Sequence, residues 1–255
     1  MEGDAALNET AGTGRADLQV HTRFGDGMAT AREIFDWNAE YGGLDVIAVT
    51  DHDDVRGALE AREAWAQGGY SFDFVPGIEV TTRSGHLLAL WVDTPIPSLR
   101  GLDETVELIH EAGGLAVVPH AFSMGTRSVG RRALERVMRL TSWAQKPDGL
   151  EVANPVRFGW DCGEKTHYLN RTRWGLAETG GSDAHFMESL GSAYTEFPGR
   201  TAEELRSAIV NRQTRGVLSH GTPLREIGLR KLVHQQVRGL SVTPRKVLGQ
   251  LFGRG

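Results

Sequence analysis

Short apolar runs alternate with amphipathic patterns along most of the chain. The apolar runs predict strands at 17–20, 44–50, 73–79, 86–92, 115–118, 149–152, 174–179 and 216–219. The amphipathic patterns predict helices at 30–41, 57–67, 102–112, 130–140, 161–170 and 201–211. Strands that alternate with helices are typical of a mainly parallel sheet, and this number of strands favours a barrel over a small open sheet.

Two of the predicted helices begin with a recognisable start signal. Thr30 with Glu33 and Thr201 with Glu204 match the capping box, in which each side chain satisfies a free backbone N–H of the first turn. We interpret these residues as structural.

The two ends of the chain differ in pattern from the middle. Residues 1–16 are rich in Gly, Ala and Thr without periodicity, which predicts a mobile leader before a single barrel domain at 17–220. Residues 221–255 lose the strand pattern, and from residue 219 onward the chain holds seven Lys and Arg against one acidic residue. We expect a basic amphipathic extension that packs on the barrel; the alternative is a contact surface for a membrane or nucleic acid.

The composition fits a globular protein and excludes several classes. With 255 residues, 40% hydrophobic and 24% charged, the proportions are ordinary, and the net charge of −5 provides no general attraction to nucleic acid or anionic membranes. The one cysteine, Cys162, excludes an intramolecular disulfide and a multi-cysteine zinc site. The start lacks a secretory pattern and no apolar run reaches the length of a membrane span, so we expect a cytoplasmic protein.

Histidines and carboxylates gather where the predicted strands end. The chain carries His21 after DLQV, Asp51-His52 after VIAVT, Glu79 after FVPGI, His120 after AVVP, and Asp183 and His185 after the strand at 174–179. In a barrel of parallel strands these ends lie on one face, and the residue types are those that bind metals. Each residue alone is more often a turn, cap or surface residue. Together with His86, at the start of the predicted strand 86–92, they predict a metal site, because chance would scatter the histidines over the helices.

Five segments of the chain resemble the PHP (polymerase and histidinol phosphatase) superfamily of metal-dependent phosphoesterases. In the expected order they are DLQVHTRFGDG (17–27), VTDHD (49–53), GIEVTTRSGHLLAL (77–90), VVPHA (117–121) and GGSDAH (180–185). The spacing and the GHLLAL segment are more similar to the small stand-alone members, including a carbamate-hydrolase-like branch, than to the polymerase-embedded domains. The resemblance implies a single-domain α/β fold, a distorted (β/α)7 barrel similar to a TIM barrel, which holds two or three divalent ions.

The resemblance also implies roles for individual residues. Glu79 would bridge two ions, one completed by His86 and His120 and the other by His21 and Asp183. The residues to which it assigns catalytic roles are Glu79, Asp183, His185 and Asp51.

A third ion and one departure from the family pattern complete the implied site. Asp26, His52 and His185 would hold the third ion, and Asp51 would orient a neighbouring ligand. The family's opening motif is normally His-x-His, and here its first position is Gln19. A glutamine carbonyl is a weaker, neutral ligand than imidazole, so the ion beside it would bind loosely, use water as its missing ligand or be absent.

The implied ligand set is suited to hydrolysis. A carboxylate that bridges two cations places them roughly 3.5–4 Å apart, which lowers the pKa of bound water and clamps the oxygens of a phosphoryl displacement. The nucleophile would be metal-bound hydroxide, and zinc, manganese and iron all suit the mixed shell. Arg127, in GTRSVGRR, and Arg23, in the first motif, could bind phosphate oxygens; the alternative is a solvated basic loop.

Three functions are open on the sequence alone. The leading hypothesis is a phosphoesterase that acts on a small phosphorylated substrate, such as a nucleotide or the end of an oligonucleotide, and the acidic body favours the small substrate. The second uses the same ions on a carbamate, amide or carboxylic ester. The third is a metal-stabilised binding or regulatory module that has lost catalysis through Gln19.

Overall fold

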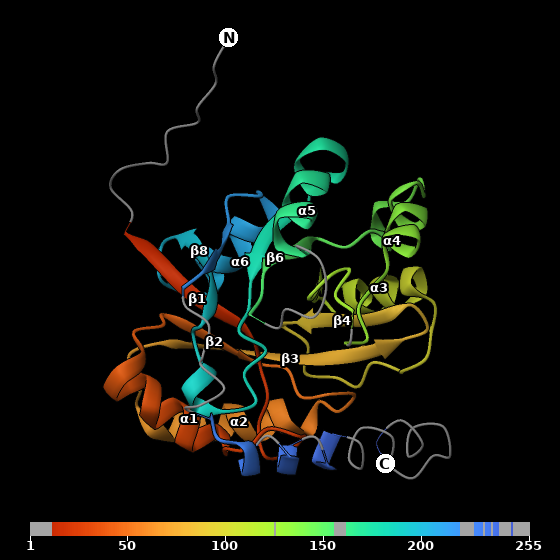
Figure 1. The fold of residues 1–255 in the computed structure, drawn as a ribbon. Helices are drawn as coiled ribbons and strands as arrows, with labels where there is room; N and C mark the ends of the chain where they lie inside the picture. Colours follow the sequence, from red (N-terminus) through yellow and green to blue (C-terminus); the bar gives the residue numbers. More distant parts are fainter. Residues whose placement is uncertain are drawn as a thin grey trace.

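The computed structural model describes residues 12–124, 126–155, 162–219, 227–231, 233–235, 237–239 and 246. Within these residues the chain forms a nine-stranded sheet with the order β7-β6-β5-β4-β3-β2-β1-β8-β9. The strands are β1 (Thr13–Val20), β2 (Val46–Val49), β3 (Asp73–Thr82), β4 (Gly85–Leu90), β5 (Leu115–Val118), β6 (Gly149–Ala153), β7 (Ala177–Gly180), β8 (Ala193–Pro198) and β9 (Arg215–Leu218). Figure 1 shows the helices arranged around the sheet.

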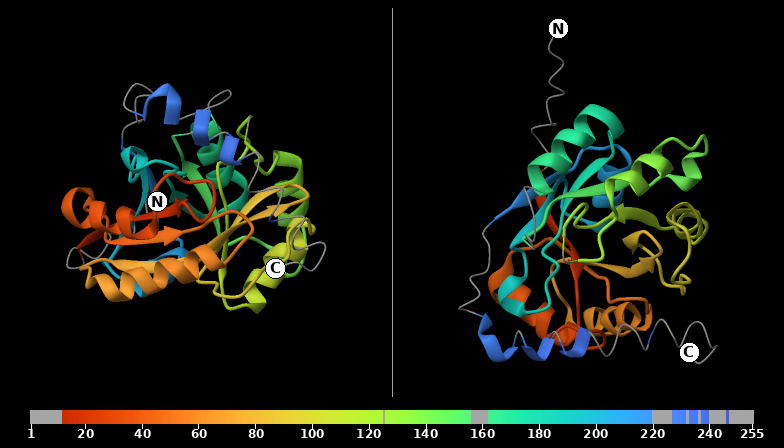
Figure 2. Two further views of the ribbon diagram at one scale, coloured as in Figure 1. Left: turned by 90° about the horizontal axis from the view of Figure 1, so that it is seen from below. Right: turned by 45° about the vertical axis from the view of Figure 1, so that its right-hand side comes forward.

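The strand directions bring the carboxyl ends of six strands to one side of the sheet. Strands β1, β2 and β3 pair in parallel, as do β5, β6 and β7, and β4 lies antiparallel between the two groups. Strand β7 approaches β8 because the Thr195 hydroxyl both donates to the carbonyl of Gly180 and accepts from its N–H, at 2.9 Å each. The sheet is therefore a nearly closed barrel, which confirms the predicted fold class (Figure 2).

The barrel contains more strands than the seven that the resemblance implies. Strands β8 and β9 form an antiparallel pair beside β1. A search for continuous apolar runs misses β8, because its residues alternate between buried and partly buried positions and include Thr195 and Glu196. Such alternation is typical of an antiparallel strand with one face on the core.

Six α-helices lie among the described residues, close to the predicted ranges. They are α1 (Ala31–Trp37), α2 (Arg56–Gly68), α3 (Leu102–Glu111), α4 (Arg131–Met138), α5 (Cys162–Leu169) and α6 (Ala202–Val210). Both predicted capping boxes are present, at Thr30 and Thr201. Helices α1 and α5 continue as short π-helical turns, Asn38–Gly42 and Asn170–Trp174. The first divides the helix predicted at 30–41 into two conformations, and the second extends beyond the predicted end at residue 170.

The barrel begins earlier than the sequence pattern indicates. Strand β1 starts at Thr13 rather than Asp17, because residues 13–16 pair with β8. Residues 1–11 and most of the predicted extension at 221–255 lie outside the described residues. In the part of the chain that the structure describes, every helix is too short or too polar to cross a membrane.

The core of the barrel is apolar except near one end. Strands β2 and β5 are buried along their whole length, as continuous apolar runs predict. Strands β3 and β4, by contrast, bury Glu79 and His86. Burial of a carboxylate and an imidazole is unfavourable unless each finds a partner, so this end of the barrel points to a functional site.

Candidate metal centre

The predicted ligands come together at the carboxyl end of the parallel strands. They are His21 and Asp26 after β1, His52 after β2, Glu79 in β3, His86 in β4, His120 after β5, and Asp183 and His185 after β7. One of them differs from its predicted local setting, because Glu79 lies inside a strand that continues to Thr82, whereas His86 lies at the start of β4, where the strand at 86–92 is predicted. His21 and His185, which are 164 positions apart in the sequence, thus share one cluster, as the barrel predicts.

Glu79 lies at the centre of this cluster, and its two carboxylate oxygens face different histidines. Oε1 lies 2.7 Å from His86 Nδ1 and 3.1 Å from His120 Nε2. Oε2 lies 3.1 Å from His21 Nε2, which is also 3.1 Å from Asp183 Oδ1. One group of ligands therefore meets each oxygen, which is the arrangement that a bridging carboxylate requires.

Asp26 gathers a second set of histidines around its carboxylate. Its Oδ2 lies 3.2 Å from His185 Nε2 and 4.0 Å from His52 Nε2, and its Oδ1 lies 3.9 Å from His21 Nδ1. His52 also faces inward, with Nδ1 3.7 Å from Glu79 Oε2. His52 thus lies between the two sets, whereas the resemblance places it with the third ion alone.

The unsatisfied atoms of the cluster fit divalent cations. Three sets of side chains each offer ligand atoms within 4.8 Å of one another, namely His21, Asp26, His52 and His185; His52, Glu79 and His86; and His21, Glu79 and Asp183. Among the described residues, the buried atoms that have no hydrogen-bond partner include both ring nitrogens of His21, Nδ1 of His52, Nε2 of His86 and Oδ1 of Asp26. Buried polar atoms are normally paired, and lone pairs that face one another without a shared proton are satisfied by a cation.

The ionisable side chains of the centre differ in the protonation state that their surroundings favour. Burial alone would raise the pKa of Glu79, but the nearby charges of His52 and His86 hold that pKa well below its usual range. Burial lowers the pKa of His52 to about 4. The cluster thus combines an ionised carboxylate and one neutral imidazole, which are the forms that bind metal ions, with three imidazoles whose pKa is raised. Nearby carboxylates overcome the effect of burial and raise the pKa of His120 to about 9, that of His21 well above its usual value and that of His185. A bound cation would take the place of the protons on these three rings.

Gln19 turns its side chain toward the central carboxylate. Its Nε2 donates to Glu79 Oε2 at 2.9 Å, and its buried Oε1 has no hydrogen-bond partner among the described residues. The amide N–H therefore donates a hydrogen bond at the position where an imidazole would offer a lone pair. Its carbonyl oxygen is available as a neutral ligand.

Two buried aspartates after β2 fix the strands that carry the ligands. Asp51 accepts hydrogen bonds from the Thr22 backbone N–H at 2.8 Å and the Thr22 hydroxyl at 2.6 Å, directly beside His21. Asp53 accepts from the Thr81 N–H at 2.7 Å and so holds β3 next to Glu79. Asp51 is a predicted site residue that orients the loop rather than joining the ligand atoms, and the sequence reasoning missed Asp53.

A third buried carboxylate, Glu151, supports His120 and was also missed. It accepts from the His120 backbone N–H at 2.6 Å, while the Ser128 hydroxyl lies 2.8 Å from His120 Nδ1. Burial raises the pKa of Glu151 to about 8, although its hydrogen bonds and the nearby His120 act in the opposite direction. The signal was an acidic residue in the apolar strand GLEVA of β6.

The two predicted substrate arginines, Arg127 and Arg23, lie in different surroundings. The carbonyl of Arg127 accepts from the His86 N–H at 2.6 Å, and the Arg127 side chain is exposed. The guanidinium of Arg23 donates to Met28 O at 3.0 Å and lies 3.8 Å from Glu33. The Arg23 guanidinium therefore contacts groups near the start of α1, whereas Arg127 is exposed next to the strand that carries His86.

Comparison with known sequences supports the resemblance. A family model described as PHP-associated matches residues 170–214. An uncharacterized protein of Methanocaldococcus jannaschii is 31% identical over 151 residues, which cover 55% of this chain and 81% of that protein.

Two further relatives have named activities. The 5′-3′ exoribonuclease Rnm of Salmonella typhimurium is 30% identical over 100 residues, which cover 38% of this chain and 34% of that enzyme. A 3′,5′-nucleoside bisphosphate phosphatase of Chromobacterium violaceum is 36% identical over 87 residues, which cover 32% of this chain and 30% of that enzyme. The chain matches about a third of the length of each of these enzymes.

The fold leads to the same group of proteins. A solved structure of a two-domain protein from Bacteroides vulgatus, described as containing a predicted PHP-like metal-dependent phosphoesterase, superposes with a TM-score of 0.65 at 17% identity, over 89% of this chain and 70% of that one. Barrel and cluster together define the class of metal-dependent hydrolase barrels. Within that class, the chain belongs to the PHP superfamily, which confirms the resemblance.

Proposed function

We propose that this chain is a metal-dependent phosphoesterase that hydrolyses a small phosphorylated substrate, a nucleotide or the end of an oligonucleotide. The observation that carries the proposal is the position of Glu79, whose two oxygens face separate groups of buried ligands. Two divalent ions, of zinc, manganese or iron, would lower the pKa of water and neutralise phosphate charge at this place. The named activities of the two enzyme relatives support a phosphorylated nucleotide or an RNA end as substrate.

The roles that we propose for individual side chains follow from their contacts. His21 and Asp183 hold one side of the Glu79 carboxylate, and His86 and His120 hold the other. Asp26, His52 and His185 form the third set, and Gln19 contributes its carbonyl oxygen. Asp51 keeps the loop after β1 in place, and Arg127 binds a phosphate oxygen. We assign these roles to one barrel unit, residues 17–220.

The first experiment measures metal content per chain. Untagged protein is purified without chelators and analysed by elemental mass spectrometry, and we expect two or three equivalents of zinc, manganese or iron. A value near zero that added metal does not restore would contradict the proposal. Protein with bound metal is then screened against nucleoside monophosphates, nucleoside bisphosphates and short 5′-phosphorylated oligonucleotides.

The substrate class is tested at Arg127. We expect Arg127→Ala to reduce turnover of phosphate substrates by on the order of 10²-fold, because an electrostatic contact to the reacting group is lost. The matched control is Arg131→Ala, since the Arg131 guanidinium contacts Glu135 at 2.8 Å on the surface of α4. A chain that hydrolyses carbamates or carboxylic esters instead would keep its activity on those substrates in both variants.

Gln19 favours a second candidate, a metal-binding regulatory module without catalysis. The N–H group of Gln19 donates a hydrogen bond to Glu79 Oε2, and this occupies a lone pair that could otherwise bind a metal ion. Under this alternative the wild type binds metal but turns over none of the substrates, and Gln19→His creates activity. Under the proposed function the wild type is already active, and Glu79→Gln abolishes the activity.

A further inference from the structure

The C-terminal segment lies against the loop that carries Asp26. We use this name for the described residues from 227 onward, which Figures 1 and 2 show in blue on the side of the molecule that α1 and α2 occupy. Arg238 Nη2 donates to the carbonyl of Arg23 at 2.7 Å and to that of Gly25 at 2.8 Å. A single guanidinium group thus joins two backbone positions of the turn immediately before Asp26.

The same segment also contacts Asp26 itself. Gln235 Nε2 lies 3.5 Å from Asp26 Oδ2, and a Cβ added to Gly239 would come within 3.2 Å of that oxygen. These contacts are on Oδ2, while Oδ1 has no hydrogen-bond partner among the described residues. Lys246 Nζ lies 4.6 Å from the ring centroid of Phe24, so each residue from 23 to 26 meets the C-terminal segment.

A second anchor joins the segment to the loop of another ligand. Lys231 Nζ contacts Glu188 Oε1 at 2.6 Å, in the short 3-10 helix Met187–Ser189 that follows His185. The two loops are themselves joined, because the Met28 N–H donates to the carbonyl of His185 at 2.9 Å. The C-terminal segment therefore spans the two loops whose side chains, Asp26 and His185, meet in one set of ligands.

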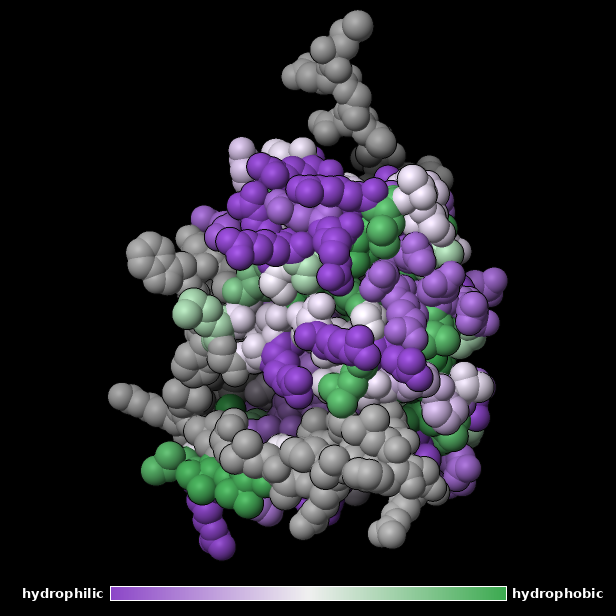
Figure 3. All heavy atoms as spheres, turned by 90° about the vertical axis from the view of Figure 1, so that its right-hand side faces the viewer, coloured by the Kyte–Doolittle hydropathy of each residue, from purple (hydrophilic) through white to green (hydrophobic). Residues whose placement is uncertain are grey.

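Three apolar side chains among the described residues of the segment are exposed to solvent. Leu229, Val233 and Val237 follow one another at four-residue spacing, which places them on one helical face, and they are 77%, 55% and 59% exposed. Figure 3 shows hydrophobic surface at the lower edge of the molecule, where this segment lies. Among the described residues of the segment, Ile227 is the buried apolar one. Among the described residues, the contacts that join the segment to the barrel are largely polar, and those of Arg238 are the shortest to the loop of Asp26.

We propose that Arg238 and Gln235 are positioning residues for Asp26, and that the C-terminal segment completes the set of ligands formed by Asp26, His52 and His185. The inference rests on the proposed metal-dependent function. Its physical basis is that Asp26 and His185 come from loops, which a strand does not hold in register, and that groups behind a ligand fix its orientation. Loss of such an outer partner weakens metal binding by roughly 10- to 100-fold.

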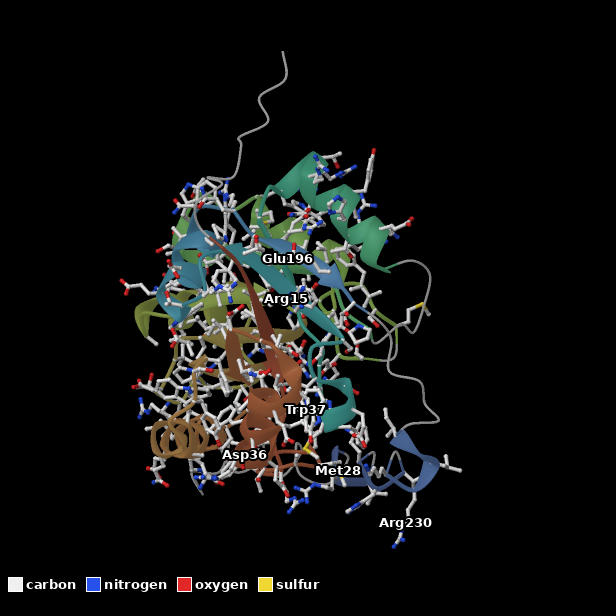
Figure 4. All side chains as sticks on the ribbon, turned by 90° about the vertical axis from the view of Figure 1, so that its left-hand side faces the viewer. Arg15, Met28, Asp36, Trp37, Glu196 and Arg230 are labelled. Carbon is white, nitrogen blue, oxygen red and sulfur yellow. The ribbon has the colours of Figure 1, made fainter. Side chains whose placement is uncertain are left out.

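The experiment compares Arg238→Ala with Arg230→Ala in the full chain. Arg230 is the matched control because it lies on the same segment and its side chain points away from the barrel (Figure 4). Both proteins are loaded with the metal found in the wild type and dialysed against metal-free buffer, and metal per chain is measured. We expect Arg238→Ala to lose one equivalent, with at least tenfold weaker binding of that ion, while Arg230→Ala matches the wild type. Arg238→Lys should restore part of the loss, because an ammonium group can donate to both carbonyls.

A second readout does not depend on metal. Hydrogen exchange of the backbone at residues 22–27 should become faster in metal-free Arg238→Ala than in metal-free Arg230→Ala, because the turn loses the donor that joins Arg23 to Gly25. Equal metal content and equal exchange in the two variants would overturn the positioning role and leave the proposed function intact. A different outcome is a wild type that binds no metal while residues 22–27 still exchange faster in Arg238→Ala than in Arg230→Ala. That result would overturn the proposed function, and Arg238 would then stabilise the loop without positioning a metal ligand.

Discussion

The two ends of the barrel both place a histidine beside a carboxylate, but the ring nitrogens of these histidines meet different surroundings. At the amino end of β5 and β6, His110 Nδ1 contacts Ala144 O at 2.9 Å and Nε2 contacts Asp148 Oδ2 at 2.9 Å, so both nitrogens have partners. At the carboxyl end, both nitrogens of His21 are buried without a hydrogen-bond partner in the described part of the chain, although Glu79 Oε2 lies 3.1 Å away.

This contrast shows that proximity to a carboxylate does not identify a metal ligand. His110 is satisfied by protons alone, and the pair that it forms with Asp148 joins α3 to the start of β6. His21 faces two carboxylates and stacks with the rings of His52 and His185, with centroid distances of 4.8 and 4.2 Å. A divalent cation would satisfy these facing lone pairs together, so variants of the two ends should differ in whether they lose metal or only a hydrogen bond.

The largest effect is expected at Glu79, which both groups of ligands share. Glu79→Gln keeps the shape of the side chain but removes the charge that balances two cations. We expect loss of at least two metal equivalents and a fall in phosphoesterase turnover on the order of 10³-fold, the upper range for loss of one electrostatic group. Elemental analysis and steady-state kinetics measure the two effects. Glu60→Gln, an exposed position on α2, is the control, and normal metal content in Glu79→Gln would remove the basis for a bridging role.

A smaller effect is expected at Asp26, which serves one set of ligands. Asp26→Asn should lose one equivalent of metal and about 10²-fold in turnover, because the ligands around Glu79 are unchanged. The measurement is metal stoichiometry with turnover at saturating metal. If Asp26→Asn lost all of its metal, the ligands around Asp26 and those around Glu79 would not bind their ions independently.

Gln19→His should act in the opposite direction. The substitution replaces an N–H that donates to Glu79 with a ring nitrogen that can coordinate. We expect the ion beside His21 and Asp183 to bind roughly tenfold more tightly, equal to about 1.4 kcal/mol. Competition with a chelator of known affinity measures the change. Unchanged affinity would show that the glutamine carbonyl already serves as an adequate ligand.

Much of this site could be predicted from the sequence, because its ligands follow apolar runs. His21, His52 and His120 each come within three residues of the end of such a run, and the barrel brings the ends of these runs to one face. The same rule places Glu79 at the end of a strand, whereas it lies inside β3, which continues to Thr82.

The supporting contacts could not be predicted in the same way. Glu151 and Asp53 act through hydrogen bonds to the backbone of other strands, and such bonds depend on the register of the sheet rather than on local pattern. The contacts of Arg238 with Arg23 and Gly25 join residues more than 200 positions apart, which no periodicity records. Hydrophobic pattern therefore predicts which residues reach the site, and tertiary structure decides how firmly each is held.

The smallest effect is expected at the amino end, where the comparison predicts a pH dependence of stability rather than of metal binding. The hydrogen bond that His110 donates to Asp148 raises the pKa of His110 because it stabilises the protonated ring, and partial burial opposes this only in part. A raised pKa in the folded state means that the stabilisation is fully present below the unfolded value, about pH 6.5, and is lost as the pH rises through the folded value. We expect His110→Gln to reduce the free energy of unfolding by on the order of 1 kcal/mol at about pH 5.5 and by less at about pH 9. Denaturant titrations of His110→Gln, Asp148→Asn and the double variant isolate the pair. A coupling energy that is the same at both pH values would contradict the proposed protonation of His110. A change in metal content in His110→Gln would show that this histidine affects the metal centre as well as stability.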